Sequence, residues 1–175
     1  MSGCMSSFGG MGTIVLCEGL QQLKNEHPPL LEQLEGLLKL VTHIENGVDV
    51  TENFRELTVK TQEFIADLGP HSDREEGVLF EMMGTYIGRT SGPIAVMEYE
   101  HDRAKTLIGN YLATTGAENV NFTIDEINTL AKQIKEAYYT LTDHFAKEEN
   151  VLFPMAQRML SEEEKAELHR RIQEI

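Results

Sequence analysis

Two histidine–glutamate motifs of nearly identical sequence lie 73 positions apart in the chain. Residues 71–82 and 144–155 both follow the pattern His-x-x-x-Glu-Glu-x-Val-Leu-Phe-x-Met. A histidine and a glutamate four residues apart project from the same face of a helix, about one turn apart. Imidazole and carboxylate groups are common metal ligands, so the two motifs predict two halves of a metal site.

The repeat also includes one histidine ahead of each motif. Glu26-His27 and Glu100-His101 correspond at an offset of 74 residues, close to the offset between the motifs. The chain therefore reads as a duplicated helix pair, in which the first helix carries a lone histidine and the second carries His-x-x-x-Glu. Two such pairs have approximate two-fold symmetry, which suits two equivalent metal ions.

Four long amphipathic segments must position these residues. Apolar residues in each segment recur at alternating spacings of three and four, the pattern of a bundle helix that buries one face. The segments run from Leu20 to Asn46, from the capping sequence Asp49–Glu52 to a turn at 89–92, from Pro93 to about Gly116, and onward from a capping box at Thr123–Glu126. A further capping box at Ser161–Glu164 predicts a short, charged C-terminal helix.

The short connections predict an all-α fold, an antiparallel up-down four-helix bundle with a short extra C-terminal helix. Residues 1–19 are expected to form a flexible N-terminal lead, and residues 20–175 the bundle. Pro28-Pro29 should restart or bend the first helix, and Gly69-Pro70 should kink the second. Pro154 should distort or end the fourth helix.

The composition limits the classes of function. The 175 residues carry a formal net charge of −14, which argues against nucleic acid and anionic membranes as partners. The chain has no apolar run of about 18 residues that could span a membrane. It also has no signal peptide, so we expect a cytoplasmic protein. The two cysteines, Cys4 and Cys17, are too few and too peripheral for a disulfide framework or a cysteine metal site.

Six polar residues of the repeat fall on the inward stripes of the four helices. They are His27, His71, Glu75, His101, His144 and Glu148. Burying an unpaired carboxylate costs several kcal/mol, so a stable bundle needs a cation beside the two glutamates. Four imidazoles and two carboxylates suit iron, manganese or zinc. The stripe of the fourth helix should continue beyond Glu148 through Val151 and Met155.

Other residues of the same types are expected to have ordinary roles. A single core histidine is more often structural than a ligand, and only the two-fold repetition favours a metal here. His43 and His169 lie off the stripes and should be surface residues. Glu76 and Glu149 lie about 100° around the helix from the ligand positions, so they should support the ligands or face solvent.

Other chemistries of helical bundles have less support. Ferritin-like di-iron proteins use two Glu-x-x-His motifs, and here only residues 98–101 fit that pattern. The sequence contains no Cys-x-x-Cys, P-loop or Gly-x-Ser-x-Gly motif. A hydrolase that uses a serine or cysteine nucleophile is therefore unsupported.

The complete pattern resembles the hemerythrin-like (HHE cation-binding) domain. Residues 92–101 and 143–154, which contain the third and fourth histidines of the pattern, are most similar to the di-iron proteins called RIC, for repair of iron centres. The resemblance covers about residues 20–160. It implies two non-haem iron ions, each held by two of the four histidines. Glu75 and Glu148 would bridge the ions, with or without an additional oxo or hydroxo group.

The same resemblance implies an activity. Members bind or react with dioxygen, nitric oxide or peroxide, and RIC proteins deliver iron for iron–sulfur cluster repair under oxidative or nitrosative stress. Damaged iron–sulfur proteins and an electron donor are then the implied partners. Oxygen-carrying hemerythrins have a fifth histidine at the position of Lys105, and an aspartate at the position of Glu149 in place of Glu148. We therefore expect open coordination positions rather than simple reversible oxygen storage.

Three functions from different classes are compatible with these residues. The first is a stress-response di-iron protein of the RIC kind. The second is a non-catalytic module that senses or stores oxygen, nitric oxide or iron. The third is a metal-free or zinc-bound bundle that acts through protein partners. Metal analysis of the purified protein separates the third from the other two.

Overall fold

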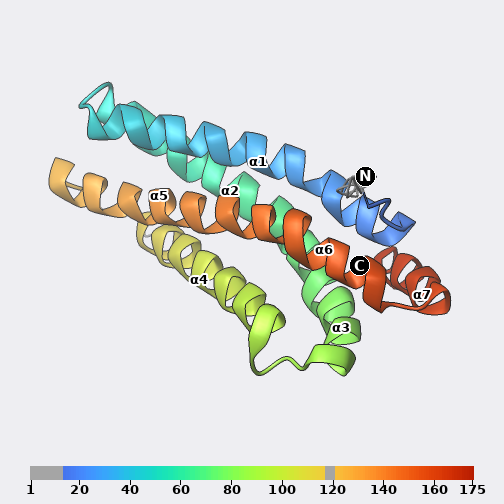
Figure 1. Ribbon diagram of the computed structural model, residues 1–175. Coiled ribbons are helices and arrows are strands. Elements are labelled where there is room, and N and C mark those ends of the chain that lie inside the picture. The colour runs from blue at the N-terminus through green and yellow to red at the C-terminus, as the bar shows by residue number, and fades with distance from the viewer. Residues whose placement is uncertain (1–13, 117–120) are drawn as a thin grey trace, which may run out of the picture.

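The computed structural model describes residues 14–116 and 121–175, and nearly all of them are helical (Figure 1). The α-helices are α1 (Glu18–Glu45), α2 (Val50–Arg74), α3 (Phe80–Ile87), α4 (Gly92–Thr115), α5 (Ile124–Lys147), α6 (Phe153–Met159) and α7 (Glu162–Ile172). Two π-helical turns, η1 (Glu75–Leu79) and η2 (Glu148–Leu152), join α2 to α3 and α5 to α6. No strand forms within the described ranges.

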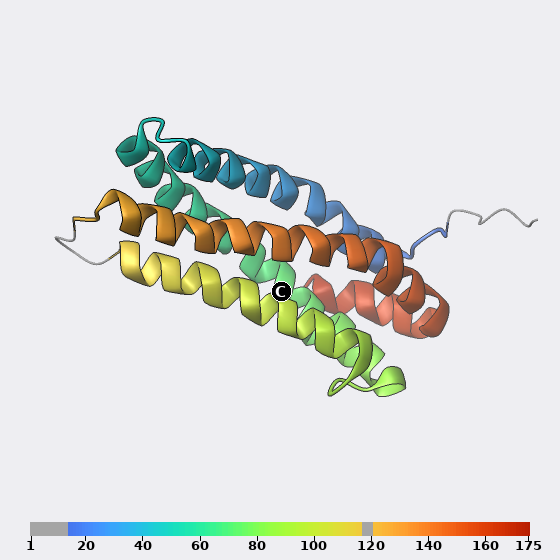
Figure 2. The same ribbon diagram turned by 60° about the vertical axis from the view of Figure 1, so that its left-hand side comes forward.

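Four antiparallel rods make up the bundle. The rods are α1, then α2 with η1 and α3, then α4, and finally α5 with η2 and α6. Figure 2 shows α5 between α1 and α4, and α1 packs mainly against α2 and α5. The short α7 folds back onto the beginning of α1 and onto η1. The predicted four-helix bundle with an extra C-terminal helix is confirmed.

The apolar core has two parts, separated by a layer of polar side chains. One part fills the long body of the bundle and includes Leu34, Phe64 and Leu141. The other fills the end near α7 and includes Leu23 and Phe153. The buried histidines and glutamates of the repeat lie along each rod between residues of these two parts. The bundle therefore holds its polar residues in one internal layer, closed on both sides by apolar packing.

Two of the three predicted capping sites are built as expected. Thr123 and Ser161 each accept a hydrogen bond from the backbone N–H three residues later, where Glu126 and Glu164 in turn accept from the N–H of the cap residue. α2 also begins at the predicted place. However, Asp49 has a left-handed backbone with φ of 37°, and its side chain makes no capping bond to any described residue. The capping role predicted for this residue is therefore wrong.

The prolines do not interrupt the helices that contain them. α1 runs through Pro28 and Pro29 without a fresh start, and α2 runs through Pro70. Pro28 and Pro29 are exposed, so water can bind the carbonyls one turn earlier that have lost an amide partner. The predicted restart of the first helix is therefore wrong. Pro154 lies in the first turn of α6, directly after η2, where a distortion was expected.

Each repeated motif contains a π-helical turn that begins at its glutamate. The turn is closed by an N–H that donates to the carbonyl of the glutamate five residues back. The extra residue shifts the side chains that follow relative to an uninterrupted α-helix. In the first motif the predicted inward residues Val78 and Met82 are nevertheless buried. The second motif differs. Val151, predicted to face inward, is 52% exposed, and the next two residues are buried instead. Met155 is only half-buried.

The predicted lead of residues 1–19 is described only in part. Residues 1–13, which include Cys4, lie outside the described residues. Leu16 and Cys17 pack against the core near α7, where the N–H of Cys17 donates to Oε1 of Gln157 at 2.7 Å. α1 then begins at Glu18. Within residues 14–116 and 121–175, no helix combines the length and the apolar character that crossing a bilayer requires.

Candidate metal centre

Six polar side chains meet in the layer between the two parts of the core. His27 comes from α1, His71 from α2, His101 from α4 and His144 from α5, while Glu75 and Glu148 begin the two π-helical turns. Each of the six is at most 1% exposed. The structure therefore brings together all the residues that the sequence indicates as candidate ligands, far from solvent.

The six residues form two groups that share both glutamates. One group contains the histidines of α1 and α2, the other contains those of α4 and α5, and both contain Glu75 and Glu148. Within each group the candidate ligand atoms lie within 4.8 Å of one another. Each group could hold a metal ion, and imidazole with carboxylate suits a transition metal.

The two oxygens of Glu75 face different groups. Oε1 lies 3.4 Å from Nε2 of His71 and 3.9 Å from Nε2 of His27. Oε2 lies 3.5 Å from Nε2 of His101, on the opposite side. One carboxylate can therefore offer an oxygen to each group.

Glu148 is oriented in the same way. Its Oε2 lies 3.4 Å from Nε2 of His27, and its Oε1 lies 3.2 Å from Nε2 of His144. Two ligand atoms bound to one ion at about 2.1 Å are about 3.0–3.4 Å apart at ordinary coordination angles. The spacing between nitrogen and oxygen in both groups is close to this range.

The atoms at the centre form no hydrogen bonds. The Nε2 atoms of the four histidines and both oxygens of Glu75 and Glu148 are buried and have no hydrogen-bond partner among the described residues. Leaving buried polar groups without partners is costly, and native structures rarely do so. Eight such atoms that converge on one layer fit a metal site, because a cation would satisfy all of them.

Carboxylates from the first helix of each pair orient two of the histidines. Nδ1 of His71 donates to Oε2 of Glu26 at 2.7 Å, and Nδ1 of His144 donates to Oε2 of Glu100 at 3.2 Å. An ionised carboxylate only accepts hydrogen bonds, so the proton resides on Nδ1. In the neutral imidazole Nε2 then has the lone pair, which faces the centre.

The other two histidines are oriented by the residue that follows each buried glutamate. Nδ1 of His101 donates to Oε1 of Glu76 at 2.7 Å, and Nδ1 of His27 donates to Oε1 of Glu149 at 2.9 Å. The π-helical turns begin at the preceding glutamate, so adjacent carboxylates serve different purposes. One faces the centre and the next holds a histidine.

A basic side chain contacts each of these four supporting carboxylates. Lys24 pairs with Glu149 at 3.3 Å, Arg74 with Glu26 at 3.1 Å, Lys105 with Glu76 at 2.9 Å, and Lys147 with Glu100. Four chains of histidine, carboxylate and cation thus run outward from the centre. Lys105, at the position of a fifth histidine in oxygen carriers, belongs to one of these chains.

The buried carboxylates raise the pKa values of two histidines. Burial lowers the pKa of His27, but Glu148 and Glu75 outweigh this effect and raise it to about 10. Burial likewise opposes a raised pKa in His144, which Glu148 and Glu100 bring to about 9. Burial alone would raise the pKa of Glu148, yet the two histidines hold it well below its usual range. A metal ion that binds here must therefore displace protons.

The sequence contains one sign of the supporting carboxylates, a Glu-His pair that occurs in both halves of the repeat, but spacing alone did not reveal its role. Glu26 and Glu100 precede the two lone histidines at the repeat offset, yet only the structure gives them a histidine partner. Glu76 and Glu149 were predicted to support the ligands or face solvent, and both do the first. The cations were missed because their partners come from other helices.

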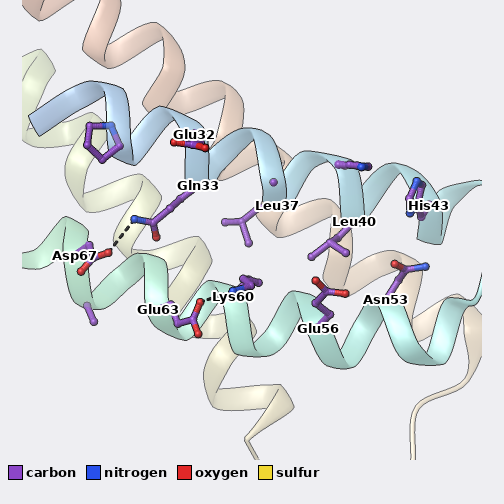
Figure 3. A pocket seen from close by; sticks show the side chains of 14 residues that line it. Glu32, Gln33, Leu37, Leu40, His43, Asn53, Glu56, Lys60, Glu63 and Asp67 are labelled. Carbon is purple, nitrogen blue, oxygen red and sulfur yellow. Dashed lines mark hydrogen bonds and ion pairs between the residues drawn. The ribbon is translucent and has the colours of Figure 1, made fainter.

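A groove between α1 and α2 lies away from the centre. Its volume is about 950 Å³, and Leu37 and Leu40 line it between charged side chains (Figure 3). Gln33 donates to Asp67 across it at 2.8 Å. The half-buried His43 also lines this groove, so it takes no part in the centre.

Comparisons with known proteins agree with this architecture. The family model described as "Hemerythrin HHE cation binding domain" matches residues 18–156. The iron–sulfur cluster repair proteins YtfE of Salmonella schwarzengrund and Salmonella newport are each 35% identical to the chain over 130 residues. These matches cover 71% of this chain and 58% of each relative. The chain thus aligns with somewhat more than half the length of these curated relatives.

The matched residues 18–156 contain all six residues of the centre and the four rods up to the first half of α6. The resemblance seen in the motifs is therefore confirmed over most of the chain. Because the family model covers residues 18–156, the chain belongs to the hemerythrin family of HHE cation-binding domains.

Proposed function

We propose that the chain binds a pair of non-haem iron ions and serves in the repair of iron–sulfur clusters under oxidative or nitrosative stress. The main support for the metal pair is the orientation of Glu75 and Glu148, each of which turns one oxygen toward either pair of histidines. The name of the YtfE relatives supports iron as the metal and repair as the role.

In this proposal His27 and His71 would hold one ion, His101 and His144 would hold the other, and Glu75 and Glu148 would each offer an oxygen to both. A ferrous pair would supply up to two electrons to bound dioxygen, nitric oxide or peroxide. The protein's contribution is to fix the histidine tautomers through the supporting carboxylates and to exclude bulk water, since every candidate ligand is buried.

Iron delivery to damaged iron–sulfur proteins, with an electron donor as a second partner, belongs to the same proposal. A second function, binding of oxygen, nitric oxide or iron without turnover, is favoured by the burial of all six side chains. Deep burial slows the release of a metal ion, and release is needed for delivery but not for sensing or storage.

The metal assignment is tested by iron analysis of the anaerobically loaded protein and by its near-ultraviolet spectrum after oxidation. We expect two iron ions per chain, one for each group of ligands. His71→Ala should lose about half of this iron, because it removes one of the few ligands of one ion. His43→Ala, which changes a histidine in the α1–α2 groove, should keep all of it. Unchanged iron in the His71 variant would refute the ligand assignment.

The role is tested by reactivation of an iron–sulfur enzyme that has been damaged by nitric oxide. The iron-loaded protein should restore activity faster than the same concentration of free ferrous iron, and the His71→Ala variant should not. Equal rates with free iron would favour the binding module over repair.

A further inference from the structure

The two halves of the centre are alike in most of their apolar surroundings. Phe153 stacks on His27 with ring centroids 5.6 Å apart and planes at 25°. Its equivalent in the repeat, Phe80, stacks on His101 at 5.9 Å and 23°. The two-fold relation between the halves therefore holds at the level of individual rings.

The relation fails at the residue that follows the motif histidine. Phe145, after His144, stacks on His27 at 4.4 Å. The equivalent residue after His71 is Ser72, which is fully buried. The two-fold relation places His27 onto His101 and the position of Phe145 onto that of Ser72. Ser72 therefore occupies, beside His101, the position that Phe145 occupies beside His27. A small polar side chain thus replaces an aromatic ring on one side of the centre.

Two further differences point to the same side. Leu30, three residues after His27, corresponds to Ala104, three residues after His101, and both are buried. The contact between α2 and α4, which the two-fold relation pairs with that between α1 and α5, is also the less extensive of the two. The α2–α4 side is therefore built from smaller residues and packed less tightly.

The hydroxyl on this side has no partner. Oγ of Ser72 is buried and makes no hydrogen bond to any described residue. A serine in a helix usually bonds the carbonyl one turn earlier, and a buried donor without a partner costs stability. A free donor beside a metal ligand is suited to a bound molecule that carries an acceptor atom.

We propose that the α2–α4 side of the centre receives the small exogenous ligand and that Ser72 donates a hydrogen bond to it. The ligand is a diatomic or linear triatomic molecule or anion with an acceptor atom at its free end. This inference rests on the proposed metal pair. It adds that the two ions would not be equivalent: the ligand would reach the ion held by His101 and His144, because the ring of Phe145 covers His27 on the other side.

The test is an optical titration of the oxidised, iron-loaded protein with sodium azide, after the iron content of each variant has been measured. Ser72→Ala removes the donor without adding volume, so azide affinity should fall about five-fold, the effect of one ordinary hydrogen bond. Ser72→Val also adds side-chain volume and should weaken azide binding by about tenfold or more.

A control variant locates the effect. Thr61→Val removes another buried hydroxyl of α2 that has no partner among the described residues, but about three turns before His71, and should leave azide affinity unchanged. With two irons bound, wild-type azide affinity in both Ser72 variants would overturn the inference. Failure of the wild type to load iron would instead refute the proposed function.

Discussion

Each histidine of the centre has one ring nitrogen on a carboxylate and turns the other toward the centre, which sets its orientation and the tautomer of the neutral ring. Nδ1 donates to a glutamate, and a lysine or arginine contacts that glutamate in turn. The carboxylate makes the imidazole a stronger ligand, and the cation offsets the added negative charge. Ten acidic or imidazole groups can therefore share one small region because every outer carboxylate has a cation beside it.

The supporting carboxylates should control metal affinity without contacting the metal. Glu26→Gln keeps an acceptor for Nδ1 of His71 but removes the charge, so affinity for iron should fall about 10- to 100-fold. Competition with a calibrated chelator measures this change. Glu63→Gln, which alters an exposed glutamate paired with Lys60, is the matched control and should bind iron normally. Equal affinities in both variants would contradict a supporting role for Glu26.

The raised histidine pKa values predict how the metal-free protein responds to base. Between the ordinary pKa of 6.5 and the folded values of about 10 for His27 and about 9 for His144, the folded state binds more protons than the unfolded state. The free energy of unfolding should therefore fall as the pH rises through this interval. Urea unfolding in the presence of a chelator at pH 6.5, 8 and 9.5 measures it.

At acidic pH the free energy of unfolding should change in the opposite direction and fall as the pH falls. The pKa of Glu76 is lowered to about 2, mainly by its hydrogen bond with His101, and that of Glu148 lies well below its usual value. Their contributions to stability are complete above the ordinary pKa of 4.5 and disappear as the pH falls through the folded values. For the alkaline prediction, a urea unfolding midpoint that stays constant or rises from pH 6.5 to 9.5 would contradict the raised pKa values of the two histidines.

At the scale of the element, the two π-helical turns begin at the two buried glutamates of the centre. Each places a buried glutamate and its neighbour so that one faces the centre and the other reaches a histidine on another rod. Such turns are frequent at functional sites, which agrees with their presence at both motifs.

Substitutions at the N-cap residues of α5 and α2 should change stability in opposite directions. Thr123→Ala removes a complete capping box and should destabilise the protein by about 1 kcal/mol. Asp49 makes no capping bond and has a left-handed backbone, so Asp49→Gly should stabilise it by about 0.5–1 kcal/mol. Thermal and urea unfolding of both variants measures the two effects. Loss of stability in the Asp49 variant would show that its side chain contributes to the turn.

At the scale of the whole molecule, the polar layer divides the core and lies where all four rods meet. Apolar packing above and below it holds the ligand atoms in place before metal binds. A metal ion there contacts every rod at once, so binding is coupled to the stability of the entire bundle.

Metal removal should therefore lower stability globally. A ligand present at about 100 times its dissociation constant stabilises a folded protein by about 2.7 kcal/mol. Chelation of the iron should accordingly lower the melting temperature in a single cooperative transition. Calorimetry of the loaded and chelated protein measures the shift, with His71→Ala as a partial case. Equal melting temperatures with and without iron would exclude a metal that links the rods.

Much of the fold could be predicted from the sequence because bundle helices have a recognisable three-four spacing of apolar residues. The apolar stripes located the four rods, and the repeat identified six residues for the centre. The prediction failed at Val151, which is exposed although its equivalent Val78 is buried beside the same kind of π-helical turn. The alternative of a fresh helix start at Pro28 also failed, because an exposed proline can be tolerated within a long helix whose other face is packed.

The sequence by itself determined that the six histidines and glutamates of the centre lie inside the bundle, because spacing alone places them on the apolar stripes. Only the tertiary structure decided how they are used. The bridging orientation of Glu75 and Glu148, the carboxylate behind each histidine and the unpartnered hydroxyl of Ser72 all depend on contacts between different rods. Local spacing fixes the face on which a side chain lies, whereas the partner on that face is set by packing between segments far apart in the chain.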